Sequence, residues 1–212
     1  MSKLQKGILI SIEGIDGSGK STLARALQKQ LEKKDLPVLL TYEPGDSPLG
    51  KHIRKILQER DFAVCGQAEF LLFAADRTQH FTEVIIPHLE KKYIVISDRM
   101  GDSSMAYQGY ARGVNKEMIQ KVNNWAMQNR KPDTTLYIQL SVASALQRLK
   151  NRKEAPTVFE KEKEDFTKNV IKGFEEIFKN RDNVITLDGE QSADMVAKEA
   201  YDKIMKYLSV DT

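Results

Sequence analysis

Residues 7–21 read GILISIEGIDGSGKS, and this stretch decides the fold class. Its first half is a short apolar and β-branched run that stops at a glycine, as a buried strand does. Its second half satisfies the pattern G-x-x-x-x-G-K-[ST]. Leu23, Leu27 and Leu31 follow at spacing four, which predicts one face of an amphipathic helix. A strand, a glycine-rich loop and a helix in this order form the context in which that motif binds phosphate.

Each residue type in the loop has a physical task. Glycines let the backbone curl so that successive N–H groups point at phosphate oxygens, and the following helix N-terminus adds partial positive charge. Lys20 is expected on the β- and γ-phosphates of a nucleoside triphosphate, and the Ser21 hydroxyl on Mg²⁺. The alternative is a simple turn with an exposed lysine, which the flanking strand and helix disfavour. The residues expected to bind ATP here are Gly14, Ile15, Asp16, Gly17, Ser18, Gly19, Lys20 and Ser21.

Further apolar runs alternate with helical patterns along the rest of the chain. This alternation predicts a five-stranded parallel sheet with helices on both faces, in one α/β domain spanning residues 1–212. The predicted strands are 7–13, 38–42, 93–97, 134–140 and 183–187. After the loop's own helix, the predicted helices are 50–58, 69–89 with a disturbance near Pro87, 116–129, 144–152 and a final one through 196–208. Residues 150–165 interrupt this alternation of strands and helices, because ten of these sixteen residues are charged.

Composition narrows the class of protein. The chain has 212 residues, and a 41% hydrophobic fraction supports a sizeable core, which excludes disorder over most of the length. A net charge of +3 gives no reason to expect a nucleic-acid partner, and no apolar run approaches the roughly 18 residues of a membrane span. The N-terminus leads into a strand rather than a signal peptide. Cys65 is the only cysteine, so no internal disulfide can form, and we expect a cytoplasmic protein.

Three further clusters lie at or near the carboxyl ends of predicted strands, where open α/β sheets bind ligands. Residues 42–46 follow the second strand, and Asp98 and Arg99 follow the third. Phe73 and Arg77 are four residues apart on a predicted helix, so one face could stack on a planar base and hydrogen-bond its edge. Core packing is the plain alternative for Phe73, and a helix cap is the plain alternative for Asp98.

These residues together resemble the bacterial thymidylate kinase family over essentially the whole chain. The stretches that carry the resemblance are EGIDGSGKSTLA, EPGDSPLGKHIRKIL, EFLLFAADRTQH with VIIPHL, IVISDRMGDSSMAYQG and RKPDTTLYI. FAADR, and AYQG after DR, distinguish this group from adenylate and guanylate kinases. The resemblance implies the three-layer P-loop NTPase fold, a short charged lid over about 150–165 and transfer of a phosphoryl group from ATP to dTMP. It also implies Mg²⁺ with the ATP, and a homodimer.

The resemblance implies a role for each acceptor-side residue. Asp16 resembles the carboxylate that contacts the 3′-hydroxyl of the acceptor sugar, and Arg99 resembles the guanidinium that holds the acceptor phosphate. Phe73 resembles the ring stacked on thymine, and Arg77 the side chain that bonds a thymine carbonyl. Tyr107 resembles the ring that crowds the sugar 2′ position. The remaining implied residues are Ser104 and Gln108 near the base, and Asp98, which would order Mg²⁺ through water.

The chain departs from the family pattern at two arginines. Tyr42 stands where many bacterial relatives have an arginine that helps to bind the acceptor phosphate. Thr157 and Val158 precede Phe159 and Glu160 where the family lid often has an Asp-Arg pair. Both departures remove a positive charge from the expected site, and the sequence does not say how this affects affinity, turnover or discrimination against dUMP.

Charge accounting assigns the catalytic residues. The nucleophile is a phosphate oxygen of the acceptor, largely dianionic near neutral pH because its second pKa is about 6, so no general base is needed. Asp16 is therefore expected to orient the sugar, while Lys20, Arg99 and Mg²⁺ offset the repulsion between two anions. A further arginine is expected, and because this chain has Gly17 where some members of the family have a loop arginine, the resemblance implies that the lid provides it, with Arg148 and Arg152 as candidates. By the resemblance Arg148 lies nearer the adenine, which leaves Arg152 as the transition-state cation or, alternatively, as a solvated helix end.

Two other functions remain open on the sequence. One is a P-loop kinase for a deoxynucleoside or a different monophosphate, and the other is a regulatory protein that binds ATP or GTP without transferring phosphate. A switch GTPase would need an N-K-x-D motif after a later strand, and none is found there. Met118 and Trp125 lie seven residues apart on a predicted helix, which indicates either a core position or a subunit contact.

Overall fold

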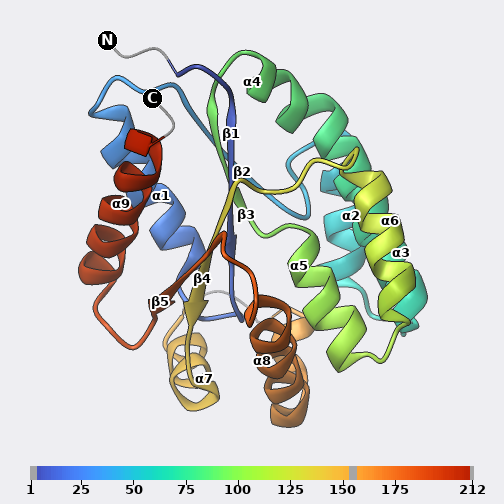
Figure 1. Ribbon diagram of the computed structural model, residues 1–212. Helices are drawn as coiled ribbons and strands as arrows, with labels where there is room; N and C mark the ends of the chain where they lie inside the picture. The colour runs from blue at the N-terminus through green and yellow to red at the C-terminus, as the bar shows by residue number, and fades with distance from the viewer. Residues whose placement is uncertain (1–3, 153–156, 211–212) are drawn as a thin grey trace.

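The computed structural model describes residues 4–152 and 157–210, and five parallel strands form its centre (Figure 1). The strand order is β2-β3-β1-β4-β5, so the strand that leads into the glycine-rich loop lies in the middle. The strands are β1 Ile8–Glu13, β2 Val38–Tyr42, β3 Ile94–Asp98, β4 Thr134–Gln139 and β5 Val184–Asp188. All five predicted strands and the parallel α/β fold are confirmed.

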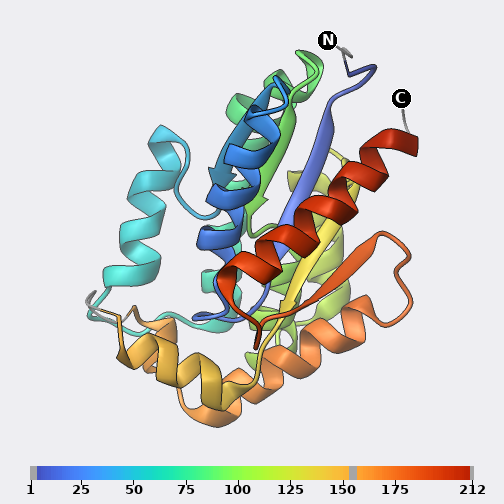
Figure 2. The same cartoon turned by 90° about the vertical axis from the view of Figure 1, so that its left-hand side faces the viewer.

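Helices cover both faces of this sheet. On one side lie α1 Lys20–Glu32 and α9 Ala193–Val210 (Figure 1). On the other side lie α3 Gly66–His80, α4 Ile86–Glu90, α5 Gly101–Ser104 and α6 Lys116–Ala126, and α2 Pro48–Glu59 packs against α3. Near the carboxyl ends of the strands lie α7 Val142–Lys150 and α8 Glu164–Phe178 (Figures 1 and 2). None of the helices in the described ranges is both long enough and apolar enough to cross a bilayer.

The central strand is buried on both faces because its side chains alternate between them. Ile8, Ile10 and Ile12 pack toward α1 and α9, in a core that also contains the predicted leucine stripe of α1. Leu9 packs the opposite way, against a separate core with Phe81. This two-sided burial explains why residues 8–12 are a continuous apolar run interrupted only by Ser11, whose hydroxyl donates to Thr135 in β4.

The helix predicted over 69–89 is two α-helices joined by a π-helical turn. The first α-helix starts earlier, at Gly66, and the π-helical turn spans Phe81–Ile85 before α4 begins. Pro87 has no N–H to donate to the carbonyl four residues back, so a regular α-helix cannot continue through it. The predicted disturbance near Pro87 is confirmed, and it takes the form of a wider turn just before the proline.

Two helical segments were not predicted from the sequence. One is α5 with the π-helix that continues it, Met105–Ala111, and the other is α8. The charged run over 150–165 masked the beginning of α8, although Val170, Phe174 and Phe178 form a buried stripe at spacing four. Of the expected lid, residues 153–156 lie outside the described residues, and a short 3₁₀ turn spans Phe159–Lys161.

Replacing Phe174 by alanine tests the packing of α8. The ring is fully buried, with ring centroids 5.4 Å from Tyr137 and 5.7 Å from Phe178. Phe174→Ala should lower the free energy of unfolding by about 3–5 kcal/mol in urea denaturation. The exposed Phe62 is the control, and its alanine variant should stay within about 0.5 kcal/mol of the wild type. A Phe174→Ala loss as small as that of the control would contradict this packing.

Candidate active site

A cleft of about 1150 Å³ opens where the carboxyl ends of the central strands meet the glycine-rich loop. It brings the loop and the acceptor-side clusters into one lining, although they lie far apart in the sequence. The predicted site residues that line it are Asp16, Gly17, Ser18, Gly19, Lys20, Ser21, Phe73, Arg77, Asp98, Arg99, Ser104, Tyr107, Gln108, Arg148 and Arg152. Gly14 and Ile15 are not in this lining. Their carbonyl oxygens accept hydrogen bonds from Arg99 and Lys20, so both residues support the cleft from behind.

The loop adopts a conformation that its glycines permit. Gly17 and Gly19 have φ angles of 82° and 96°, in the left-handed region that L-side chains rarely adopt. A Cβ on Gly17 would also lie 2.8 Å from the Ala145 carbonyl oxygen of α7. Lys20 Nζ donates to the Ile15 carbonyl at 2.8 Å and is almost completely buried. Burial, together with the nearby positive charge of Arg99, lowers the pKa of Lys20 to about 8.

Arg99 and Asp16 form an ion pair that joins the loop to the acceptor side. Arg99 Nη2 lies 2.5 Å from Asp16 Oδ1, and its Nη1 donates to the Gly14 carbonyl and the Ser103 hydroxyl. The guanidinium also lies 5.0 Å from the Tyr107 ring centroid. Burial alone would raise the pKa of Asp16, but the positive charges of Arg99 and Lys20 outweigh it and lower that pKa. Asp16 is therefore ionised, and it shares one corner of the cleft with Arg99 and Tyr107.

The Arg99 backbone is strained. Its φ is 74°, which is uncommon for a residue with a side chain. The N–H donates to the Ile12 carbonyl, and the carbonyl accepts from the Ser97 hydroxyl at 2.7 Å, so both backbone polar groups are held. Such strain persists where the surroundings overdetermine it, and it is frequent at functional sites. The conformation directs the Arg99 side chain back toward the loop.

Ser21 and Asp98 provide oxygen ligands suited to Mg²⁺. The Ser21 hydroxyl, in the first turn of α1, donates to Asp98 Oδ2 at 2.5 Å, at the end of β3. Hydroxyl and carboxylate oxygens are the hard donors that Mg²⁺ prefers, and this ion usually keeps waters and substrate phosphates as its other ligands. Within residues 4–152 and 157–210, no cluster of three or more His, Cys, Asp or Glu side chains could hold a metal by itself. The donor set fits a phosphate-bound Mg²⁺ rather than an all-protein metal site.

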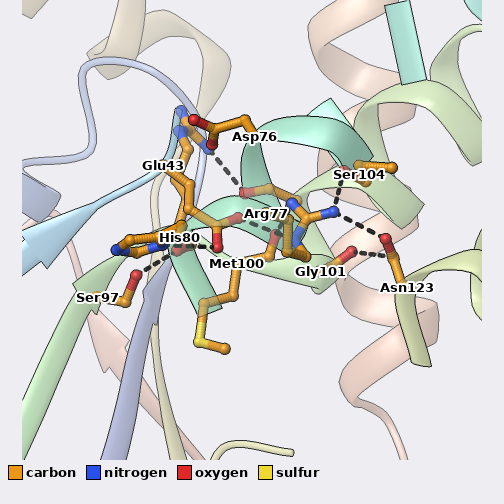
Figure 3. Close-up of polar contacts among 12 residues, drawn as sticks. Glu43, Asp76, Arg77, His80, Ser97, Met100, Gly101, Ser104 and Asn123 are labelled. Carbon is orange, nitrogen blue, oxygen red and sulfur yellow. Dashed lines mark hydrogen bonds and ion pairs between the residues drawn. The ribbon is translucent and has the colours of Figure 1, made fainter. Parts of the chain in front are cut away.

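Arg77 donates hydrogen bonds to several protein groups, which the sequence did not predict (Figure 3). The side chain is 1% exposed, and its Nε donates to Glu43 Oε2 at 2.8 Å. Its Nη1 donates to Asn123 Oδ1 at 2.8 Å and to Ser104 Oγ at 3.2 Å, and its Nη2 donates to the Met100 carbonyl. Four of its five N–H groups therefore point at protein acceptors in the described part of the chain. One Nη2–H is left for the thymine carbonyl that the resemblance implies.

A buried carboxylate network behind Arg77 was not foreseen. Glu43 Oε1 lies 3.1 Å from His80 Nδ1, and burial is outweighed by Arg77 and His80, so the pKa of Glu43 is lowered. Asp76 Oδ1 accepts from the Gly45 N–H at 3.0 Å, whereas burial and the charge of Glu43 raise the pKa of Asp76 to about 7 (Figure 3). The spacing in FAADRTQH places Asp76, Arg77 and His80 on one helix, but it gives no sign that Glu43 pairs with Arg77 and His80.

The thymine end of the expected site is lined by aromatic rings. The Phe73 ring centroid lies 5.9 Å from that of Phe159, and Phe159 lies 6.2 Å from Tyr107. Gln108 is 1% exposed, and its Nε2 donates to Glu69 at 2.9 Å. Phe159 comes from the charged segment, so the structure brings that segment to the same end of the cleft as Phe73.

The two candidate arginines, Arg148 on α7 and Arg152 two residues after it, also line the cleft. Arg148 Nη2 donates to the Gly189 carbonyl at 2.7 Å. Arg152 Nη2 donates to Glu160 Oε2 at 2.7 Å, and Arg152 is 36% exposed. Arg148 is therefore positioned by α7, and Arg152 by its contact with Glu160 just after the end of that helix. The departure at Tyr42 has a neighbour that restores positive charge, because the Arg54 guanidinium lies 5.4 Å from the Tyr42 ring centroid and lines the same cleft.

Glu13 is a further buried residue that the sequence analysis missed. It ends β1 directly before the loop, with no exposed surface, and accepts from the Met100 N–H at 2.8 Å and the Ser103 hydroxyl at 2.5 Å. These two hydrogen bonds favour the ionised form, but burial and the charge of Asp102 outweigh them. The pKa of Glu13 is therefore raised to about 8. A lone glutamate at the end of an apolar strand was the only signal in the sequence.

Comparison with known proteins gives one consistent family. The family model described as thymidylate kinase matches residues 12–200. A thymidylate kinase from Halothermothrix orenii is 39% identical over 201 residues, which covers 94% of this chain and 97% of that protein. Those from Thermosipho africanus and Carboxydothermus hydrogenoformans are 39% and 42% identical, covering 95% and 80% of this chain and 99% and 83% of those proteins.

The raised pKa of Glu13 predicts a pH-dependent stability. An unfolded glutamate titrates near 4.5 and the folded one near 8, so ionisation of Glu13 opposes folding increasingly as pH rises between these values. Glu13→Gln cannot ionise, so its stability relative to the wild type should rise with pH, on the order of 1 kcal/mol or more from pH 5 to 9. Urea denaturation across this range measures the difference. The exposed Glu59→Gln is the control, and parallel pH profiles of Glu13→Gln and the wild type would contradict the prediction.

Proposed function

Since the chain belongs to the thymidylate kinase family, it phosphorylates dTMP to dTDP with ATP, and we propose that the cleft described above is the site of this transfer. The observation that carries the proposal is the convergence of three features in one cleft. These are the glycine-rich loop with Lys20, the Arg99–Asp16 pair and the aromatic end around Phe73. Together they provide places for a triphosphate, an acceptor phosphate with its sugar, and a planar base.

The acceptor side needs orientation and charge rather than a base. The dTMP phosphate is its own nucleophile, because its second pKa of about 6 leaves it largely dianionic at neutral pH. Arg99 holds this phosphate, and the ionised Asp16 accepts a hydrogen bond from the 3′-hydroxyl. Tyr107 packs beside them at the 2′ position, where its ring disfavours a hydroxyl. Positioning two anions in line is the main contribution of these residues.

The donor side provides the cations that let the two anions approach. Lys20 contacts the β- and γ-phosphates, whose charge favours its protonated form over the neutral form that burial favours. Arg148 lies on the adenine side, and Arg152 faces the transferring group. Ser21 and Asp98 would hold the Mg²⁺ that accompanies ATP, and this ion would neutralise charge on the triphosphate.

Three finer assignments complete the proposal. We propose that residues 1–212 work as one domain, that the protein is cytoplasmic and that it has no nucleic-acid partner. We also propose a homodimer. Met118 and Trp125 on α6 are 54% and 74% exposed, so the core interpretation of this pair is wrong and the subunit contact is the one that remains. Leu71, on the adjacent α3, is 57% exposed and adds to this apolar surface.

An acceptor panel tests the function. ADP formation with ATP and Mg²⁺ should be fastest with dTMP, slower with dUMP and near background with dCMP, dGMP, AMP and thymidine. Loss of the 5-methyl group costs about 1–3 kcal/mol in a pocket, which corresponds to about 10- to 200-fold in kcat/KM. Activity with thymidine alone would instead indicate a nucleoside kinase. ADP formation independent of any acceptor would indicate a regulatory ATP-binding protein.

Replacing Arg152 tests its role as the transition-state cation. Arg152→Ala should lower kcat by roughly 10²–10³-fold, as loss of one group that stabilises developing charge does. The KM for dTMP should stay within about threefold, because the lost contact forms in the transition state. Arg130→Ala is the control, since Arg130 is equally exposed at 36% and pairs with Asp133 outside the cleft. A kcat close to that of the control variant would assign Arg152 to the solvated helix end.

A further inference from the structure

Glu69 on α3 is a buried carboxylate that the reaction described above does not use. It has no exposed surface, and its two oxygens accept hydrogen bonds from three side chains, Arg60 after α2 and Gln108 and Arg112 on and just after the π-helix Met105–Ala111. Arg60 Nη2, just after α2, lies 2.8 Å from Oε2, and Gln108 Nε2 lies 2.9 Å from Oε1. Arg112 approaches both oxygens at 3.4–3.5 Å. Glu69 therefore links α3, the end of α2 and the π-helix Met105–Ala111 next to the thymine end of the cleft.

Both arginines also reach the segment that carries Phe159. The Arg60 guanidinium lies 5.7 Å from the Phe159 ring centroid. Arg112 Nη2 donates to Glu162 Oε1 at 2.5 Å, and its guanidinium lies 4.5 Å from the Phe166 ring centroid. Phe159 is thus connected to Glu69 through one arginine directly and through the other by way of Glu162.

The charges in this cluster balance. Glu69 and Glu162 face Arg60 and Arg112, which makes two negative and two positive groups. Glu69 is fully buried and Arg60 is 5% exposed, so removing one charge leaves an uncompensated group in a poorly solvated place. Burial would lower the pKa of Arg112, but Glu162 and Glu69 outweigh it and raise that pKa. Arg112 therefore stays positively charged between the two carboxylates.

Glu69 also decides the orientation of the Gln108 amide. A carboxylate only accepts hydrogen bonds, so the Gln108 group beside it must be the NH₂. The Gln108 carbonyl oxygen is then the group left for a ligand. Thymine N3–H is a donor, and a fixed acceptor suits it. If the amide rotated by 180°, it would present a donor to this N–H instead.

We propose that Glu69 is a positioning residue that fixes both the Gln108 carbonyl and the Phe159 ring at the thymine end of the cleft. This inference rests on the proposed placement of the base beside Phe73. One carboxylate thereby couples base recognition to the segment that covers the base. It acts through Gln108, Arg60 and Arg112, and it does not contact the nucleotide itself.

Glu69→Gln tests the proposal, because it keeps the shape of the side chain and removes its charge. The KM for dTMP should rise about tenfold or more, as loss of a hydrogen bond to a buried charge implies, while kcat and the KM for ATP stay within about threefold. Arg112→Met removes the contacts to Glu162 and Phe166 and the longer ones to Glu69, but leaves Arg60 and Gln108 on Glu69, so it should raise the KM for dTMP by a smaller factor. Arg181→Met is the matched control, since Arg181 also joins a partly buried ion pair, with Asp102, and stacks on Phe178. It should leave all three constants unchanged.

A fluorescence reporter separates this inference from the placement of the base. Trp125 is the only tryptophan, so Trp125→Phe combined with Phe159→Trp reports on position 159 alone. In nucleotide-free protein, adding Glu69→Gln or Arg112→Met should shift the emission to the red and increase acrylamide quenching, and adding Arg181→Met should do neither. Unchanged emission in both variants would overturn the positioning role. Changed emission with an unchanged KM for dTMP would keep the anchoring of Phe159 and overturn the placement of the base. If Glu69→Gln does not fold, Arg112→Met decides the same question.

Discussion

The ion pair between Arg99 and Asp16 is the interaction on which the site depends. It links the end of β3 to the glycine-rich loop after β1, and these two strands are neighbours in the sheet. Arg99 reaches Asp16 because its backbone takes a left-handed conformation that the Ile12 carbonyl and the Ser97 hydroxyl hold in place. In the proposed function, the pair holds a cation for the acceptor phosphate and an anion for the sugar at one corner of the cleft. This is the preorganisation that a reaction between two anions requires.

Buried carboxylates surround this pair and hold the cleft from behind. Glu13 lies beneath the Arg99 loop, Glu43 pairs with Arg77, and Glu69 pairs with Arg60. A buried charge is costly unless a partner compensates it. Glu43 and Glu69 have arginine partners, whereas the hydrogen bonds that Glu13 accepts come from the Met100 N–H and the Ser103 hydroxyl, and burial with the charge of Asp102 raises the pKa of Glu13 to about 8. The ion pairs of Glu43 and Glu69 therefore hold the elements around the cleft in place. Ionisation of Glu13, by contrast, lowers the stability of the fold.

The departures from the family pattern show how the site remains positively charged. Tyr42 removes an expected arginine, but Arg54 lies against its ring and donates to the Pro44 carbonyl at 2.7 Å. The lid lacks the expected Asp-Arg pair, and Arg152, just after α7, lines the cleft beside Glu160. One cation thus comes from α2 and the other from the residues that follow α7. Positive charge in the cleft therefore does not depend on the two altered positions alone, since Arg54 and Arg152 also line it.

The sequence by itself determined the sheet and the phosphate-binding loop, because strand periodicity, loop glycines and helix faces are local patterns. The family followed from the resemblance of several whole stretches of sequence, and the comparisons show it. The sequence also predicted many of the residues that line the cleft, partly because parallel strands bring their carboxyl ends to one edge. It missed α8, whose start lies in a charged run, and the partners of the buried charges. Only the tertiary structure decided that Arg77 is held by Glu43, 34 residues away, and by Asn123, 46 residues away. Which buried charge meets which partner depends on how helices pack across the sheet, and no short stretch of sequence contains that information.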